Sequence, residues 1–204
     1  NEILKHKANL IISALQNKSM GYHYPIIYGT DISKVWALRK AGLGLLSGMI
    51  GDAKPVSVVE DTAVAPIRLP EYIADFKAMM DGYGLNCVYH AHISTGELHL
   101  RPILNLKDEK DKKLFRKVAT DCTLLVKKYR GSISGEHGDG RLRGEFIPLL
   151  LGEKVYSLMR DIKHVWDSQN IFNKGKIVDT PPMDESLRYS NTFLEVKPYF
   201  DFTK

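Results

Sequence analysis

The sequence predicts an α+β fold whose elements follow the order β-α-β-β-α-β between residues 54 and 140. Two helix-length segments with apolar stripes alternate with short β-rich runs, and only a Ser-Thr-Gly turn separates the two middle runs. This order is typical of the ferredoxin-like, split β-α-β arrangement, an antiparallel sheet with its helices on one face. We expect added helices before and after this core.

The segment before the core is predicted to be helical. Residues 1–18 place apolar side chains at helical spacing, which indicates an amphipathic helix. A second helix is expected over residues 31–49, where Asp31 can cap the N-terminus. Gly42 and Gly44 lie in its later turns and should weaken them.

The core elements follow from composition and periodicity. Residues 54–61 are β-branched, Pro70 lies where a helix of residues 69–84 would begin, and residues 108–129 carry the spacing of a second helix. The remaining elements are two strands, 85–93 and 97–104, and a short final strand, 132–137.

We interpret residues 1–204 as a single domain in four parts. These are a helical lead-in (1–53), the ferredoxin-like core (54–140), a helical closing segment (141–178) and a Pro-containing tail or linker (179–204). The first residue is Asn rather than Met, so we expect the chain to be a piece of a longer protein.

The composition is that of an ordinary globular protein, with 44% hydrophobic and 26% charged residues. A net charge of +5 without a long basic run argues against nucleic-acid binding and hints at an anionic substrate. Cys87 and Cys122 lack metal-binding spacing, which favours free thiols in a reducing compartment. No apolar run approaches the ~18 to 20 residues of a transmembrane helix. We therefore expect a cytoplasmic protein that could approach a membrane only peripherally.

The predicted hairpin gathers three histidines and an arginine on one face. A turn centred between Thr95 and Gly96 would place His92 opposite His99 and His90 opposite Arg101. Opposed Cβ atoms are ~4.5 to 5.5 Å apart, which lets two imidazoles converge on one ion. The alternative is a solvent-exposed sheet face that happens to be rich in histidine.

A second polar cluster follows the predicted final strand, where Glu136 and His137 lie between Gly135 and Gly138. The glycine spacing is one residue too long for a dinucleotide-binding loop. His92, His99 and Glu136 could form a His2Glu site for a divalent ion, with His137 as a general base. A tight turn with polar capping is the alternative. The residues alone leave open oxidation, a stand-alone metal-dependent hydrolase and a non-catalytic ferredoxin-like binding module.

At these residues the sequence resembles the C-terminal domain of FAD-linked oxidases of the D-lactate dehydrogenase, glycolate oxidase and D-2-hydroxyglutarate dehydrogenase type. Their H-x-G-x-G-x-L-H and G-E-H-G-x-G motifs are matched by HISTGELH (92–99) and GEHGDG (135–140). Further similarity lies in residues 35–42, 54–73 and 166–178.

The resemblance implies a FAD-dependent oxidation of a lactate- or glycolate-like D-2-hydroxy acid to the 2-oxo acid. It also implies a role for each matching position. These are metal ligands for Zn, Mn or Fe (His92, His99, Glu136), a catalytic base (His137), substrate-binding cations (Arg39, Lys54, Arg101) and FAD contacts (Asn173, Lys176).

The tail PPMDESLRY resembles the bacterial subgroup in which an N-terminal FAD domain precedes this region and an iron-sulfur domain follows it. We therefore expect FAD to be held mainly by a missing domain, a [4Fe-4S] cluster only in the downstream domain, and no activity from this chain alone. Ser94, Leu43, Arg101 and Lys174 depart from the family pattern. Leu43 and Arg101 argue against 2-hydroxyglutarate bound in the usual way, and Arg101 could hold a second anionic group.

Overall fold

The computed structural model describes residues 2–189 and 199. It divides the chain into two compact units, Asn1–Gly48 and Met49–Lys204. The first unit contains two helices, α1 (Glu2–Asn17) and α2 (Asp31–Ser47).

Helix α2 differs in detail from its prediction. Thr30 occupies the N-cap position without a side-chain cap, and Asp31 instead forms an ion pair with Lys34 at 2.7 Å. The helix continues through Gly42 and Gly44 and ends at Ser47, so these glycines do not interrupt it. Helix α1 buries none of its residues.

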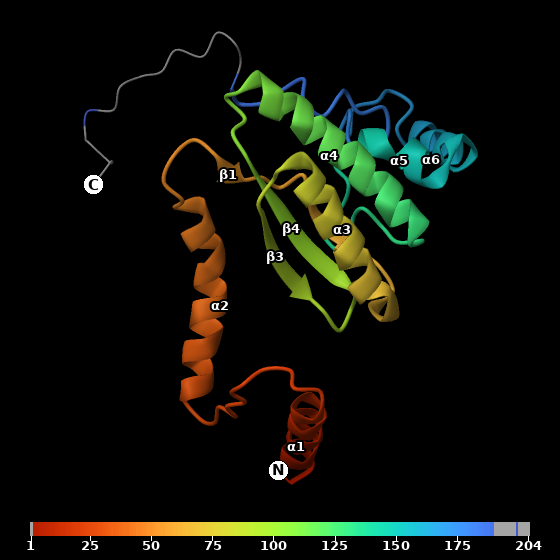
Figure 1. The fold of residues 1–204 in the computed structure, drawn as a ribbon. Coiled ribbons are helices and arrows are strands. Elements are labelled where there is room, and N and C mark those ends of the chain that lie inside the picture. Colours follow the sequence, from red (N-terminus) through yellow and green to blue (C-terminus); the bar gives the residue numbers. More distant parts are fainter. Residues whose placement is uncertain (1, 190–198, 200–204) are drawn as a thin grey trace. The chain divides into compact units, whose positions relative to one another are not determined.

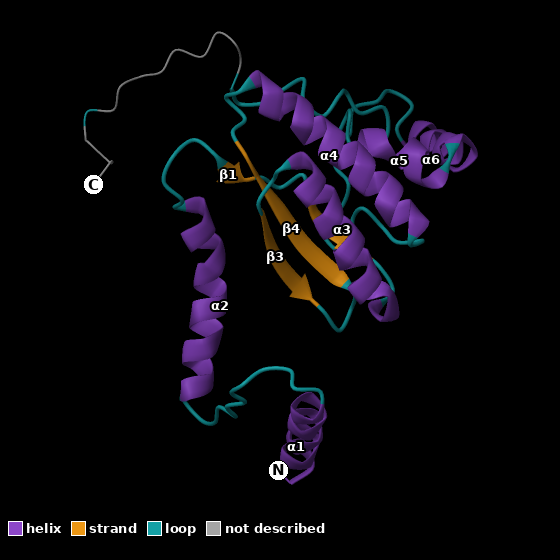
Figure 2. Ribbon diagram, in the orientation of Figure 1, coloured by secondary structure: helices purple, strands orange, loops and turns teal. Residues whose placement is uncertain are grey.

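The second unit has the predicted α+β composition (Figures 1 and 2). Its regular elements are β1 (Lys54–Pro55), β2 (Val59–Ala63), α3 (Leu69–Tyr83), β3 (Cys87–His92), β4 (Glu97–Leu104), α4 (Glu109–Lys128), α5 (Ile147–Leu151) and α6 (Glu153–Trp166). Short 3-10 turns, Pro66–Arg68 and Gly144–Phe146, precede α3 and α5.

The sheet is antiparallel and centred on β4. Strands β2 and β3 pair with its two edges, while β1 pairs with its C-terminal end. The predicted final strand, residues 132–137, is reduced to a single antiparallel bridge between Ala63 and Ser132. The ferredoxin-like order is therefore present, with its fourth strand represented by that bridge.

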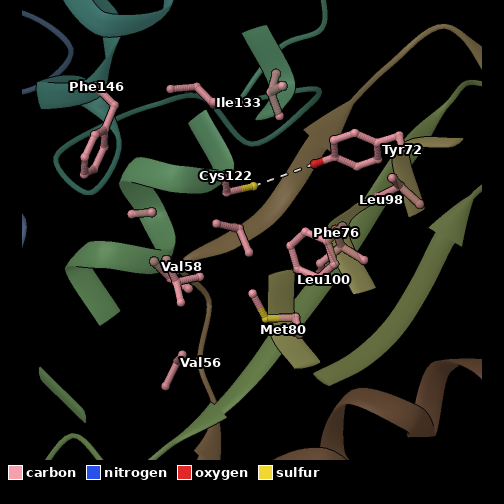
Figure 3. Close-up of a cluster of buried hydrophobic side chains, with 14 of the residues drawn as sticks. Val56, Val58, Tyr72, Phe76, Met80, Leu98, Leu100, Cys122, Ile133 and Phe146 are labelled. Carbon is pink, nitrogen blue, oxygen red and sulfur yellow. Dashed lines mark hydrogen bonds between the residues drawn. The ribbon is translucent and has the colours of Figure 1, made fainter. Parts of the chain in front are cut away.

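Helices α3 and α4 cover one face of the sheet, as Figures 1 and 2 show. The buried core between them contains Tyr72, Phe76 and Met80 of α3, Val118, Cys122 and Val126 of α4, and Leu98 and Leu100 of β4 (Figure 3). The Tyr72 hydroxyl lies 3.1 Å from Thr62 Oγ1 and 3.7 Å from Cys122 Sγ. Burying each large apolar side chain adds roughly 1.5 to 3 kcal/mol to the stability of the folded protein. Because this face forms the core, the alternate residues of β4 are left for the opposite face.

Within the described part of the chain, no helix is both long enough and apolar enough to cross a bilayer.

Candidate metal and substrate site

The β3–β4 hairpin carries its histidines in a register shifted by two residues from the predicted one. His90 lies opposite His99, and His92 lies opposite Glu97. The prediction that His92 faces His99 and His90 faces Arg101 was therefore wrong. The shift is even, so every side chain keeps its predicted face.

The shift arises because the loop is longer than predicted. Residues 93–96 form it, and the amide of Thr95 donates to the carbonyl of His92 at 3.0 Å. Gly96 closes the loop with a φ of 81°, and its carbonyl accepts from the amide of Val64 at 3.0 Å. A Cβ at residue 96 would lie 1.9 Å from the Val64 carbonyl oxygen. The motif glycine is thus required by backbone conformation and by close approach.

The imidazoles of the polar face lie in contact with one another. Ring centroids are 5.0 Å apart for His92 and His99, and 5.5 Å apart for His90 and His99. The ring of His137 stacks on His99 at 5.4 Å, with 10° between the planes. The turn after the Ser132 bridge therefore brings His137 to the hairpin.

Glu136 joins two of these histidines in one group of donors. Its Oε1 lies 3.6 Å from His99 Nε2 and 3.9 Å from His92 Nε2, and one donor atom from each residue lies within 4.8 Å of the others. Donors bound to one ion at ~2.1 Å are ~3.0 to 3.4 Å apart, so small side-chain movements would complete the site. Two imidazoles and a carboxylate suit Zn, Mn or Fe.

The orientation of His99 supports its use as a ligand. Its Nδ1 lies 2.6 Å from the backbone carbonyl oxygen of Glu60 and must donate a proton to it. The lone pair of the neutral ring is then on Nε2, which is the nitrogen nearest Glu136. Such an outer hydrogen bond fixes the tautomer of most metal-binding histidines.

The turn that carries Glu136 and His137 is held by a buried carboxylate. Asp61 is fully buried and accepts hydrogen bonds from the amide of Glu136 (3.0 Å), the amide of His137 (2.9 Å) and the hydroxyl of Ser134 (2.6 Å). Burial alone would raise the pKa of the Asp61 carboxyl, but these hydrogen bonds lower it below its ordinary value. Asp61 is therefore an anion in the folded protein.

A second carboxyl group accompanies Asp61. Glu97 is 8% exposed, and burial followed by its hydrogen bond with Asp61 raises the pKa of its side chain. Glu97 is thus the member of the pair that takes up a proton first. Glu97 also lies so close to Gly135 that there is little room for a side chain there: a Cβ on Gly135 would lie 3.3 Å from Glu97 Cγ.

Asp61, Glu136 and His137 also offer three donor atoms within 4.8 Å of one another. This second group is less suited to an ion, since the carboxylate of Asp61 already accepts three hydrogen bonds. In the first group, the contact of His99 Nδ1 with the carbonyl of Glu60 leaves its Nε2 facing Glu136. The first group is therefore the better candidate.

The three predicted substrate cations have different surroundings. Arg101 lies on the histidine face, where its Nη2 forms an ion pair with Glu60 Oε2 at 2.7 Å. Lys54 begins β1 and donates from Nζ to the carbonyl of Met49. Arg39 belongs to α2 of the first unit, beside the ring of Trp36.

The predicted FAD contacts lie in the loop after α6. Asn173 has a φ of 46°, and its carbonyl accepts from the amide of Lys176 at 3.2 Å. The next amide, that of Ile177, donates to the carbonyl of Gly140 at 2.7 Å. This bond ties the loop to the end of the turn that carries Glu136.

Sequence reasoning assigned no role to Glu60 and Asp61, which contact the site from consecutive positions of β2. Glu60 contacts His99 through its carbonyl and Arg101 through its carboxylate, and its Oε1 lies 3.9 Å from His137 Nδ1. Two adjacent acids within an apolar strand were the available signal, because a strand that enters a core rarely carries charge without a partner.

Comparisons with known proteins identify the family. The profile of the family described as FAD linked oxidases, C-terminal domain, matches residues 2–177. D-2-hydroxyglutarate dehydrogenase of Escherichia coli (strain K12) is 37% identical over 76% of this chain and 15% of its own length. That of Pseudomonas putida is 41% identical over 72% of this chain and 14% of its own length. D-lactate dehydrogenase of Archaeoglobus fulgidus is 35% identical over 64% of this chain and 29% of its own length. The chain thus spans a small part of the relatives it matches. By the extent of these matches, the chain belongs to the C-terminal domain family of the FAD-linked oxidases.

Proposed function

We propose that this domain binds a divalent metal and a D-2-hydroxy acid for oxidation to the 2-oxo acid, with FAD as hydride acceptor. The observation that carries the proposal is the convergence of His92, His99 and Glu136 within 4.8 Å, with His137 stacked beside them. The relatives named as D-2-hydroxyglutarate and D-lactate dehydrogenases support this substrate class.

Under this proposal His137 is the base that takes the proton of the substrate hydroxyl. Its side chain is 41% exposed, so a substrate can reach it. Its Nε2 lies 3.3 Å from Glu136 Oε1, which places it next to the proposed ligands. A bound divalent ion would polarise the hydroxyl and favour the alkoxide. FAD would accept the hydride from the carbon that carries that hydroxyl.

The substrate carboxylate requires fixed cations, and Lys54 is proposed to supply one of them. Arg101 is proposed to bind a second anionic group, although its ion pair with Glu60 already neutralises its charge. A substrate must therefore compete with Glu60 for Arg101. This competition favours a substrate that carries a carboxylate in that position over one that carries a neutral group.

Metal content tests the ligand assignment. We expect purified protein to hold about one Zn, Mn or Fe per chain, and the double variant His92→Ala, His99→Ala to lose it. His164→Ala is the control, since His164 lies in α6 next to Asp179 and outside the proposed ligand group. Equal metal content in the double variant and the control would refute the assignment.

Dye-coupled oxidation tests the reaction. We expect the parent protein with its FAD domain to oxidise D-2-hydroxy acids, and His137→Ala to lower kcat by about 10²- to 10⁴-fold. This chain without that domain should show no turnover and no stable yellow colour. Arg101→Met should raise KM for dicarboxylic substrates more than for D-lactate. Full activity of His137→Ala would exclude its role as the base.

A further inference from the structure

The turn that follows the Ser132 bridge is held to β2 by hydrogen bonds to both the backbone and the side chain of Asp61. The carbonyl of Asp61 accepts from the amide of Gly135 at 2.7 Å, in addition to the three bonds that its carboxylate accepts. Four consecutive residues, 134–137, thus donate to one residue. Regular pairing with β2 is lost here, since the amide of Ser134 donates to Ser132 Oγ and those of Glu136 and His137 donate to the Asp61 carboxylate.

Arg143 completes the attachment from the other end of the turn. Its side chain is 9% exposed, and its Nη2 donates to the carbonyl of Gly138 at 2.8 Å while lying 3.5 Å from Asp61 Oδ2. The buried negative charge therefore has a buried positive partner. An unpaired carboxylate in this position would be strongly unfavourable.

We propose that Asp61 is a positioning residue that sets the places of Glu136 and His137 through their backbone amides. This inference rests on the proposed metal site and goes beyond it, because it assigns a role to a residue that touches neither ion nor substrate. Hydrogen bonds to a carboxylate are roughly twice as strong as those between neutral groups. Displacement of a reacting group by about 1 Å can cost about 10²-fold in rate. The hydrogen bonds to Asp61 would therefore affect the rate by holding Glu136 and His137 in place.

The chemistry of the three donors explains why a carboxylate is needed. Two amides and one hydroxyl donate to Asp61, and a carboxylate has two acceptor oxygens to receive them. An asparagine would replace one oxygen with an NH2 group that faces a donor. The substitution Asp61→Asn therefore keeps the volume while it removes at least one restraint.

Cobalt titration of metal-free protein tests the proposal. Bound Co²⁺ gives d–d absorption bands whose intensity reports the coordination geometry, and the titration gives its Kd. The variants are Asp61→Asn and Ser134→Ala, the second of which removes one bond to Asp61. Val118→Ala in α4 is the control, since Val118 is a fully buried core residue and is neither a proposed ligand nor part of the turn. Thermal unfolding of wild type and the three variants shows whether weaker cobalt binding comes from lower stability of the fold or from altered geometry of the ligands.

We expect Asp61→Asn to raise the Kd for Co²⁺ about 10- to 100-fold and to change the d–d bands. Ser134→Ala should raise the Kd a few-fold, and Val118→Ala should lower the melting temperature with Kd and bands unchanged. A Kd for Asp61→Asn within twofold of wild type, or an equal loss in Val118→Ala, would overturn the positioning role. If Asp61→Asn does not fold, an unchanged Kd in Ser134→Ala overturns it. Absence of Co²⁺ binding in wild type would instead refute the metal site itself.

Discussion

The hairpin loop offers a sharp test of the structure through Gly96→Ala. Residue 96 has a φ of 81°, and a Cβ there would lie 1.9 Å from the carbonyl oxygen of Val64. The carbonyl of Gly96 accepts from the amide of Val64 at 3.0 Å, so the two backbones cannot separate without loss of that bond. The same loop joins β3, which carries His92, to β4, which carries His99.

The expected destabilisation has three contributions. A side chain in the left-handed region costs about 1 to 2 kcal/mol. Loss of the Val64 hydrogen bond costs about 1 kcal/mol, and displacement of backbone atoms from a 1.9 Å contact adds about as much again. The total is about 3 to 4 kcal/mol. For a chain of this size each kcal/mol lowers the melting temperature by about 2 to 4 °C, which predicts a fall of about 6 to 16 °C.

Gly84→Ala is the matched control. Gly84 ends α3 with a φ of 67°, and a Cβ there would meet no atom within 4 Å. It should therefore cost only the conformational term of about 1 to 2 kcal/mol. Circular dichroism melts and urea unfolding would measure both variants, and cobalt binding would report the hairpin. Equal destabilisation by the two substitutions would refute the close approach of Gly96 to Val64.

Two further predictions concern the helices and the thiols. Asp108→Ala should destabilise the protein by about 1 kcal/mol in urea unfolding, because its carboxylate caps α4 by accepting from the amides of Lys110 and Asp111; no change would contradict the cap. Burial raises the pKa of Cys87 and Cys122 to about 12, so iodoacetamide at pH 8 should label them about a thousandfold more slowly than in guanidinium. Their folded pKa lies above the unfolded value, so the stability they contribute is complete below about pH 8.5 and is lost as pH rises toward 12. Fast labelling at pH 8, or stability unchanged between pH 8 and pH 11, would contradict their burial.

Periodicity was sufficient to predict the main elements of the core. The expected helix of residues 69–84 is α3, Leu69–Tyr83, and that of residues 108–129 is α4, Glu109–Lys128. Local pattern sufficed because each helix has an apolar stripe and a residue that marks one terminus. Gly84 marks the C-terminus of α3, and the cap Asp108 marks the N-terminus of α4. The face of each hairpin residue was also predictable, since alternation along a strand is independent of a shift by two.

The register and the final strand depend on contacts that no local pattern contains. The loop of residues 93–96 is held by the bond between Gly96 and Val64, and Val64 lies just beyond the end of β2, outside the hairpin. The final strand stops after Ser132 because the amide of Ser134 donates to Ser132 Oγ, and the carboxylate of Asp61 then takes the amides of Glu136 and His137. Both effects couple residues more than thirty positions apart. For the same reason the sequence pointed to Glu136 and His137 but not to the two acids of β2 that contact them.

The three proposed ligands lie in elements of unequal local stability. His99 is on the central strand, which is bonded along both edges, while His92 ends an edge strand and Glu136 lies in an irregular turn. Segments with few ladder bonds open more often than central strands, and amide exchange should follow that order. An ion shared by the three would slow exchange most at the turn and least at β4. Release of the ion would then be limited by how often the turn opens. The rate at which a bound metal dissociates would therefore report the opening of the turn, the least stable of the three ligand-bearing elements.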